Sequence, residues 1–319
     1  MLVRFIFFLF IIYGSLLIGY GVRRLFPPSA GWSKKITLFI LVFLTPLIIL
    51  NAFWSLELTD IHAKTLPLIL VAVQTLTFIP ALLLSRILSL DGKSSGSLVS
   101  CSVFSNIGFT IGGFLCFILY GDRGLYLASW YATLFLPYYY LIGFPLMGRI
   151  SEGNHVTLLD AGRRLIGTPA SLVPICVMGI GILLNISGVK RPEILNTVTT
   201  GYLSYVTVAG YSFAIGLGLS VLRSIKYIRH ALFVALIKFA YIPLVTTSLL
   251  FLFGYHRMED LLPFRIVFIE SFMPSAIMGL VLIKVFDLNE DLGNAAWFLT
   301  TFLVIPVIPA MFYLQGLFL

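Results

Sequence analysis

Long apolar stretches alternate with short polar segments along the whole chain. A helix needs about 20 apolar residues to cross the hydrocarbon core of a bilayer. The first stretch continues to Gly21 and ends at Arg23 and Arg24 without a small-residue cleavage pattern, so we interpret it as a retained span rather than a signal peptide. The pattern predicts an all-α polytopic membrane protein with ten transmembrane helices, at residues 4–22, 36–54, 64–86, 97–120, 124–148, 164–186, 195–221, 229–253, 262–284 and 293–317.

Two of these spans are interrupted near their middle by polar residues, glycine or proline. The fourth contains Ser105–Phe109 (SNIGF), and the ninth contains Phe272–Ala276 (FMPSA). Non-helical backbone at membrane depth is tolerated only where it is buried in protein or lines a cavity. Broken helices at matching positions of two halves point to the binding site of a transporter. We therefore expect helices four and nine to break and to cross at the centre of the molecule.

The two halves of the chain resemble each other. The segment Leu127–Tyr131 (LASWY) in span five is similar to Asn294–Phe298 (NAAWF) in span ten, and Pro80 in span three matches Pro243 in span eight. Each half holds five spans, and an odd number makes the second half enter the membrane from the opposite side. The sequence predicts two inverted repeats, at residues 1–150 and 151–319, which is an architecture of secondary transporters.

Composition and charge support a membrane protein and suggest its orientation. The chain is 59% hydrophobic and 11% charged, with a mean hydropathy of +1.03, whereas a soluble domain carries about 25% charged residues. The net charge of +8 comes mainly from loops, so we take it as a topology signal and expect no nucleic-acid partner. Loops after odd-numbered spans hold 13 of the 21 Lys and Arg residues, against 7 on the other side. Both termini should therefore lie on the outer side of the cell membrane, which is either a plasma membrane or a bacterial inner membrane.

Two charged residues lie away from the ends of their spans and are candidates for function. Glu270 is the one acidic residue that the predicted spans enclose, and an intramembrane acid is costly enough to indicate a functional site. Its carboxylate could hold a hard cation such as sodium or could titrate and couple protons. Lys238 could attract an anionic substrate, pair with Glu270, or extend its ammonium towards the membrane interface.

The breaks themselves offer groups suited to an anion. Half-helix N-termini carry a partial positive charge, and the amide of Asn106 could bond a carboxylate, although it could also serve only as a helix cap. Three cysteines at apolar positions fit no disulfide or metal pattern, and no two histidines are spaced for metal binding or catalysis. The substrate-binding residues that we predict are Ser105, Asn106, Gly108, Met273, Pro274 and Ser275.

Several short motifs resemble the auxin efflux carrier family, which includes PIN-like and malonate-permease-like transporters. They are the run from Ser105 to Asp122, Thr168-Pro169-Ala170, Leu184-Asn185 with Pro192 beyond, Lys238 before Pro243, and Met273-Pro274-Ser275. The resemblance covers the whole chain. It implies ten helices in two inverted repeats, with a crossover core that rocks against a scaffold domain. Plant auxin carriers often have a large hydrophilic loop between spans five and six, whereas this chain has a short one.

A second resemblance, to the bile acid–sodium symporter family, concerns ion coupling. That family holds sodium with residues at the span-four break, in span five and before the span-nine break. The resemblance implies sodium ligands here at Glu270, Ser105, Asn106, Ser129, Thr133 and Met273, and Gln74 resembles the glutamine of that family's second sodium site. Pro274 stands where that family has glutamine, and the connection between spans four and five is longer.

Together these observations predict a secondary transporter that moves a small organic anion by alternating access, coupled to sodium. An uncoupled or proton-linked efflux carrier of the auxin or dicarboxylate type, driven by membrane potential, is the alternative. A receptor or sensor without transport is a second alternative. The spans enclose one carboxylate, and no histidine lies deep in a span, so we expect no enzyme, and no cofactor beyond bound sodium. The sequence leaves a homodimer open.

Overall fold

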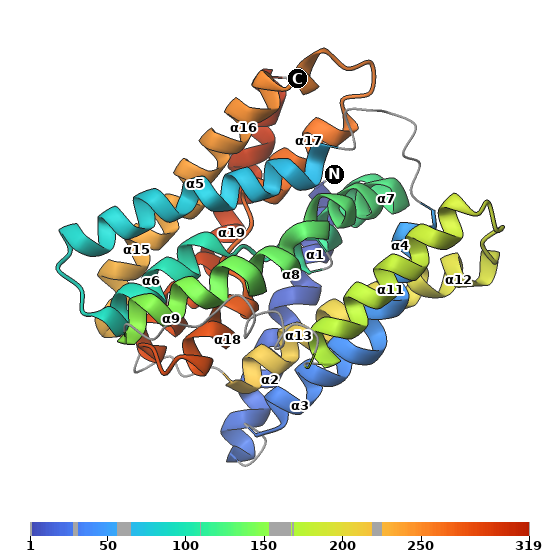
Figure 1. The fold of residues 1–319 in the computed structure, drawn as a ribbon. Helices are drawn as coiled ribbons and strands as arrows, with labels where there is room; N and C mark the ends of the chain where they lie inside the picture. The colour runs from blue at the N-terminus through green and yellow to red at the C-terminus, as the bar shows by residue number, and fades with distance from the viewer. Residues whose placement is uncertain are drawn as a thin grey trace. The chain divides into compact units, whose positions relative to one another are not determined.

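Helices form nearly all of the regular structure in the computed structural model, which describes residues 2–27, 31–55, 65–108, 110–152, 167, 169–218 and 225–318 (Figure 1). Among these residues the one β-type contact is an isolated bridge between Ser105 and Ser275. The helical fold class that the apolar pattern predicts is therefore confirmed.

The chain folds into two compact units, and each unit draws on both halves of the sequence. The first unit contains Met1–Thr59, Gly108–Trp130 and Ile166–Leu219, and the second contains Asp60–Ile107, Tyr131–Leu165 and Ser220–Leu319. The chain passes from the second unit to the first inside the first predicted break, between Ile107 and Gly108. The division into inverted halves at residues 1–150 and 151–319 stays a prediction.

The first unit consists of apolar helices, several of which contain a π-helical segment (η). Its elements are α1 (Leu2–Leu9), η1 (Phe10–Gly14), α2 (Ser15–Leu25), α3 (Trp32–Phe39), η3 (Ile40–Leu44), α4 (Thr45–Trp54), most of α7 (Ile111–Tyr131), α11 (Pro169–Ile186), α12 (Glu193–Val198), η7 (Thr199–Leu203) and α13 (Ser204–Gly218). Inside α7, Gly121 has non-helical dihedral angles (φ 66°, ψ −153°), so two helical segments meet there. That kink lies between the predicted spans four and five.

The second unit contains the start of the first predicted break, up to Ile107, and the whole of the second break. Its elements are α5 (Leu66–Ile87), α6 (Gly92–Val103), η5 (Ala132–Leu134, 3₁₀), α8 (Phe135–Tyr138), η6 (Tyr139–Gly143), α9 (Phe144–Glu152), η8 (Ile225–Tyr227, 3₁₀), α15 (Ile228–Leu236), η9 (Ile237–Tyr241), α16 (Ile242–Leu252), η10 (Tyr255–Arg257, 3₁₀), α17 (Leu262–Ser271), α18 (Ile277–Val285) and α19 (Glu290–Phe318). The η6 and η9 segments are π-helical.

Six helical segments within the described part of the chain are long and apolar enough to cross a membrane. They are Ile6–Leu25, Lys35–Trp54, Leu66–Ile87, Ile111–Ile150, Ile225–Leu252 and Glu290–Leu314. The merged segment Ile111–Ile150 covers predicted span five and the end of span four. Spans six, seven and nine fall on α11, on α12–α13 and on α17–α18, which are shorter or interrupted. The protein is therefore a multi-pass membrane protein, and the number of ten crossings stays a prediction.

Large apolar side chains on the outside of both units fit a lipid environment. Phe10 is 73% exposed in the first unit, and Leu252 is 77% exposed in the second. In water such surfaces would favour aggregation, whereas lipid tails solvate them at no cost. This distribution explains why the chain is apolar on nearly every face of its helices.

Helices α2 and α13 pack through glycine at very short range. A Cβ atom on Gly19 would lie 2.2 Å from the carbonyl oxygen of Phe213, and one on Gly216 would lie 2.1 Å from that of Leu16. Small residues let helix backbones approach closely in membranes, where van der Waals packing drives helix association. The separation of this helix pair is thus fixed by the absence of two side chains.

We expect Gly19→Ala to lower the unfolding temperature of the purified protein, because the added methyl group forces the two backbones apart. Overpacking of this kind costs roughly 1–3 kcal/mol. The matched control is Gly21→Ala on the same helix, where an added Cβ meets nothing within 4 Å. Equal melting of the two variants would contradict the close-packing argument.

Candidate functional site

Both predicted breaks are confirmed, and they pair with each other inside the second unit. Helix α6 ends at Val103, and helix α17 gives way to α18 across residues 272–276. Asn106 N–H donates to the Pro274 carbonyl at 2.8 Å, and Ala276 N–H donates to the Phe104 carbonyl at 2.8 Å. The two bonds enclose the Ser105–Ser275 bridge, so each break satisfies backbone groups of the other. Phe109 lies outside the described residues.

Helices α6 and α18 meet at this crossing and run antiparallel. Their contacts proceed from the Lys93–Asp287 ion pair, through Ser100 Oγ donating to the Gly279 carbonyl, to Ser275 Oγ donating to the Cys101 carbonyl. One serine hydroxyl from each side, that of Ser100 on α6 and that of Ser275 before α18, therefore joins the two half-helices. This role of Ser100 was not visible in the sequence, where the serines of α6 only made that segment less apolar than its neighbours.

Ser275 is anchored from two sides. Its hydroxyl donates to the Cys101 carbonyl at 2.8 Å, and its backbone N–H donates to Thr300 Oγ1 of α19 at 3.2 Å. Thr300 is fully buried and in turn donates to the Ala296 carbonyl. Sequence reasoning missed Thr300, because a single threonine in an apolar helix commonly bonds only its own helix.

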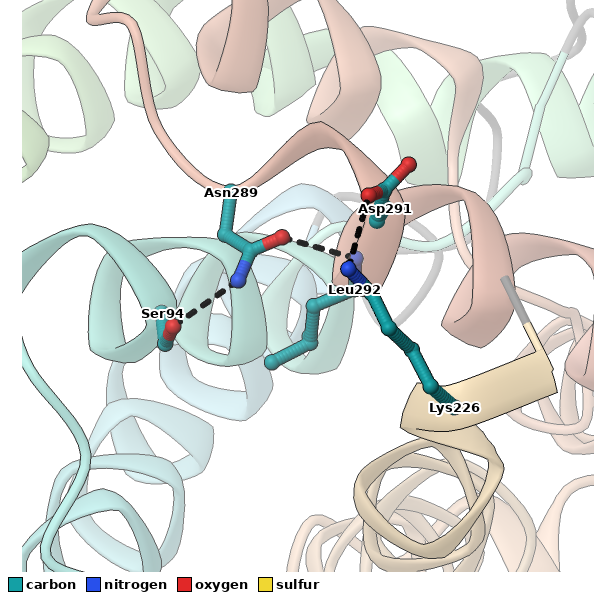
Figure 2. Close-up of polar contacts among 5 residues, drawn as sticks. All are labelled: Ser94, Lys226, Asn289, Asp291 and Leu292. Carbon is teal, nitrogen blue, oxygen red and sulfur yellow. Dashed lines mark hydrogen bonds and ion pairs between the residues drawn. The ribbon is translucent and has the colours of Figure 1, made fainter. Parts of the chain in front are cut away.

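The far ends of these helices are held by polar contacts at the edge of the unit (Figure 2). Asn289 Nδ2 donates to Ser94 Oγ at 2.9 Å, and Asn289 Oδ1 accepts from Leu292 N–H at 3.1 Å, as an N-cap of α19 does. Lys226 Nζ lies 3.4 Å from Asp291 Oδ2. These contacts join the starts of α6 and α19 to η8. The end of α6 that is remote from the break is therefore held in place.

Lys238 reaches the crossing from η9. Its side chain is fully buried, and its Nζ donates to the Phe104 carbonyl at 2.9 Å and to Ser105 Oγ at 2.8 Å. The alternative in which this side chain extends towards the membrane interface is therefore wrong, because the ammonium is bonded at the break. Pairing with Glu270 and attraction of an anion stay predictions.

Asn106 holds a buried amide next to these groups. The residue is 3% exposed, and its Nδ2 finds no hydrogen-bond partner among the residues that the structure describes. A buried N–H without a partner is costly, and each such group in a folded protein calls for an explanation. Its backbone N–H donates to the Pro274 carbonyl, so the side-chain Nδ2 is a further donor that this backbone contact does not use.

Glu270 and Met273 flank the second break. Glu270 lies in the last turn of α17 at 1% exposure, and Met273 N–H donates to the Glu270 carbonyl at 3.3 Å. Gly108 has a positive φ of 67°, a conformation that glycine adopts without strain, and it begins the next part of the first unit. The carboxylate is thus buried at the end of a half-helix, as the sequence predicted, while its role stays a prediction.

Gln74 is a further buried amide in the second unit. It is 2% exposed, and neither its Nε2 nor its Oε1 finds a partner in the described part of the chain. Hydrogen bonds from Tyr241 of η9 to the Leu76 carbonyl and between Thr65 and Tyr255 of η10 connect α5 and the residue before it to the segments that flank α16. The hydroxyl of Thr246 in α16 is also fully buried and finds no partner in the described residues.

Ser129 and Thr133 both fall within the predicted span 124–148, but they do not share a continuous α-helix. Ser129 lies in the last turn of α7, whereas Thr133 lies in the 3₁₀ segment η5. The four-residue spacing that places two side chains on one face holds for an α-helix, and the tighter 3₁₀ turn changes it. Ser129 belongs to the first unit and Thr133 to the second, so their contribution to a sodium site stays a prediction.

Two archaeal proteins are similar to this chain over most of its length. One, from Methanothermobacter thermautotrophicus, is named an uncharacterized transporter and is 25% identical over 269 residues, 83% of either chain. The other, from Methanocaldococcus jannaschii, has the same kind of name and is 26% identical over 229 residues, 69% of this chain and 68% of its own. No protein-family model matches the chain. The similarity thus extends to archaeal proteins that are named as transporters and reaches into both halves of the chain.

Proposed function

We propose that this protein is a secondary transporter that moves a small organic anion across a cell membrane, with its binding site at the pairing of the two breaks. The observation that carries the proposal is the buried Nδ2 of Asn106, a hydrogen-bond donor without a partner among the described residues, beside the buried Lys238. A carboxylate accepts bonds from such donors, and charge-assisted bonds are the stronger kind. The names of the two archaeal relatives agree with transport.

Ten crossings in two inverted repeats form the proposed topology. Contacts at the helix ends support it, because each joins two loops that the ten-span model places on one side of the membrane. The contacts after odd-numbered spans are Lys93–Asp287 and Lys226–Asp291, and those after even-numbered spans are Thr65–Tyr255 and Trp54–Val189. A model that dropped any one of spans three to nine would separate at least one of these pairs by the thickness of the bilayer.

The topology can be tested by cysteine labelling in a variant that lacks the three native cysteines. With a membrane-impermeant maleimide, we expect Glu259→Cys to label in intact cells, because its loop follows span eight. Asp91→Cys and Glu290→Cys should label only after permeabilisation, since their loops follow spans three and nine. All three residues are exposed. Labelling of Asp91→Cys and Glu259→Cys from the same side would refute the inverted model.

Alternating access in this proposal uses the two units as the moving parts. The unit that contains the pairing of the breaks carries the substrate, and the other unit serves as the scaffold. Five connections join the units in the chain, and one of them is the positive-φ position Gly108. In hinge motions, a small number of connections like these absorb the large changes in backbone dihedral angles.

Sodium coupling through Glu270 is part of the proposal, together with Thr133, Gln74 and Met273 of the same unit. One formal charge among neutral oxygens suits a monovalent ion, since calcium sites usually carry more carboxylate. An uncoupled or proton-linked carrier is the competing form. For that carrier the membrane potential alone supplies about 2.3 kcal/mol per charge per 100 mV.

A screen of carboxylate anions for thermal stabilisation of the purified protein tests the proposal first. A ligand that binds the folded state raises its stability by RT ln(1 + [L]/Kd). Each anion that stabilises the protein is then offered to proteoliposomes, with and without a sodium gradient. Uptake above that of protein-free vesicles would support transport. Binding without uptake would favour a receptor, and no binding by any anion would overturn the assigned substrate class.

A further inference from the structure

The ammonium of Lys238 occupies a position that free cations occupy in other proteins. It lies at the C-terminal end of the half-helix α6, 2.9 Å from the Phe104 carbonyl oxygen and 2.8 Å from Ser105 Oγ. Carbonyl and hydroxyl oxygens are ligands for hard cations. A helix C-terminus also carries roughly half a negative charge, which a cation stabilises. The side chain is fully buried, so lipid headgroups and water do not share this charge.

The local sequence explains how a lysine reaches this point. Lys238 lies within the π-helical segment Ile237–Tyr241, and Pro243 follows at the start of α16. Proline cannot donate the usual bond to the preceding turn, so that turn is free to widen. Lys238 lies more than a hundred residues from Phe104 in the chain. Its ammonium donates to the Phe104 carbonyl, which also accepts a hydrogen bond from the Ala276 N–H of the second break.

We propose that Lys238 is a tethered cation that takes the place of an inorganic monovalent ion at the first break. It holds Ser105 and the carbonyl of Phe104, and through them it positions the neighbouring Asn106. Ser105 is then engaged by the protein itself and does not ligate sodium, and any sodium site is confined to the side of Glu270. The consequence for coupling rests on the proposed function, whereas the cation site itself does not.

The experiment removes the tether and offers free cations in its place. Lys238→Ala leaves the Phe104 carbonyl and the Ser105 hydroxyl around a space of the size of the lost side chain. In choline chloride, an ion too large to enter, we expect the unfolding temperature to fall by roughly 5 °C or more, because breaking a buried charge contact is strongly destabilising. Ethylammonium chloride at equal ionic strength should restore at least half of the loss, with sodium restoring less.

The controls separate a specific cation site from a general salt effect. Lys284→Ala removes an exposed lysine of the same unit and should show no difference between choline and ethylammonium. Lys238→Met fills much of the space without charge and should not respond to ethylammonium either. If Lys238→Ala does not fold in choline, purification in ethylammonium followed by exchange into choline gives the same comparison, with precipitation on exchange as the expected result.

Two outcomes would overturn the proposal. Equal unfolding temperatures of Lys238→Ala in choline and ethylammonium would reduce Lys238 to a packing residue. Unchanged stability with loss of anion binding would make it a substrate ligand instead of a tether. Ser105→Ala in the otherwise unchanged protein adds an independent check, because a sodium response that disappears with Ser105 would place an inorganic ion where we place the ammonium. All unfolding measurements are made without substrate, so their result does not depend on whether the protein transports an anion.

Discussion

Replacement of Asn106 by alanine should weaken anion binding by roughly 10- to 100-fold, the range that loss of one charge-assisted hydrogen bond of about 1.5–3 kcal/mol produces. The fold should survive, because Nδ2 of Asn106 has no partner in the described residues and the backbone bond to Pro274 remains. The measurement is the dissociation constant of a stabilising anion, taken from the concentration dependence of thermal unfolding.

Ser102→Ala is the matched control for this substitution. Ser102 lies one turn earlier on α6, is fully buried, and has a hydroxyl with no partner within the described ranges. Each variant thus removes one buried polar group that has no partner in the described residues, Ser102 within α6 and Asn106 in the break that follows it. If Asn106→Ala binds the anion as tightly as the parent protein does, the pairing of the breaks is not the binding site.

Substitution of Glu270 by glutamine should abolish stabilisation by sodium. The glutamine keeps the shape of the buried side chain at the end of α17 but removes the single formal charge available to a monovalent ion. In the parent protein, sodium at 100 times its Kd should add about 2.7 kcal/mol of stability, and potassium much less. Thermal unfolding in sodium, potassium and choline chloride measures the difference.

The control for this prediction is Glu259→Gln, a neutralisation at an exposed position before the same helix. It should leave the sodium response intact. A proton-linked carrier would behave differently, since its flux would follow pH through the titration of Glu270 and ignore sodium. Equal stability and equal flux of the parent protein in sodium and potassium would rule out sodium coupling and favour the uncoupled or proton-linked form.

Local chemistry explains the features that could be predicted from the sequence alone. Apolar runs of membrane-spanning length predict helices, because every backbone group in lipid must be bonded within its own segment. Proline and glycine stop those helices locally, so the breaks around Ser105 and Pro274 and the kink near Gly121 could be located from residue type. Burial of Glu270 follows in the same way from its place inside an apolar run.

The partners of these groups were decided only by the tertiary structure. Nothing near Ser105 in the chain indicates that its break pairs with that of Ser275, or that Lys238 bonds the Phe104 carbonyl from 134 residues away. Nor does the sequence show that Gly19 must be glycine because a carbonyl of α13 lies against it, whereas Gly21 meets nothing. Hydrogen bonds and close packing depend on distances of a few ångströms between distant segments, whereas apolar pattern and backbone preference are set within one or two helical turns.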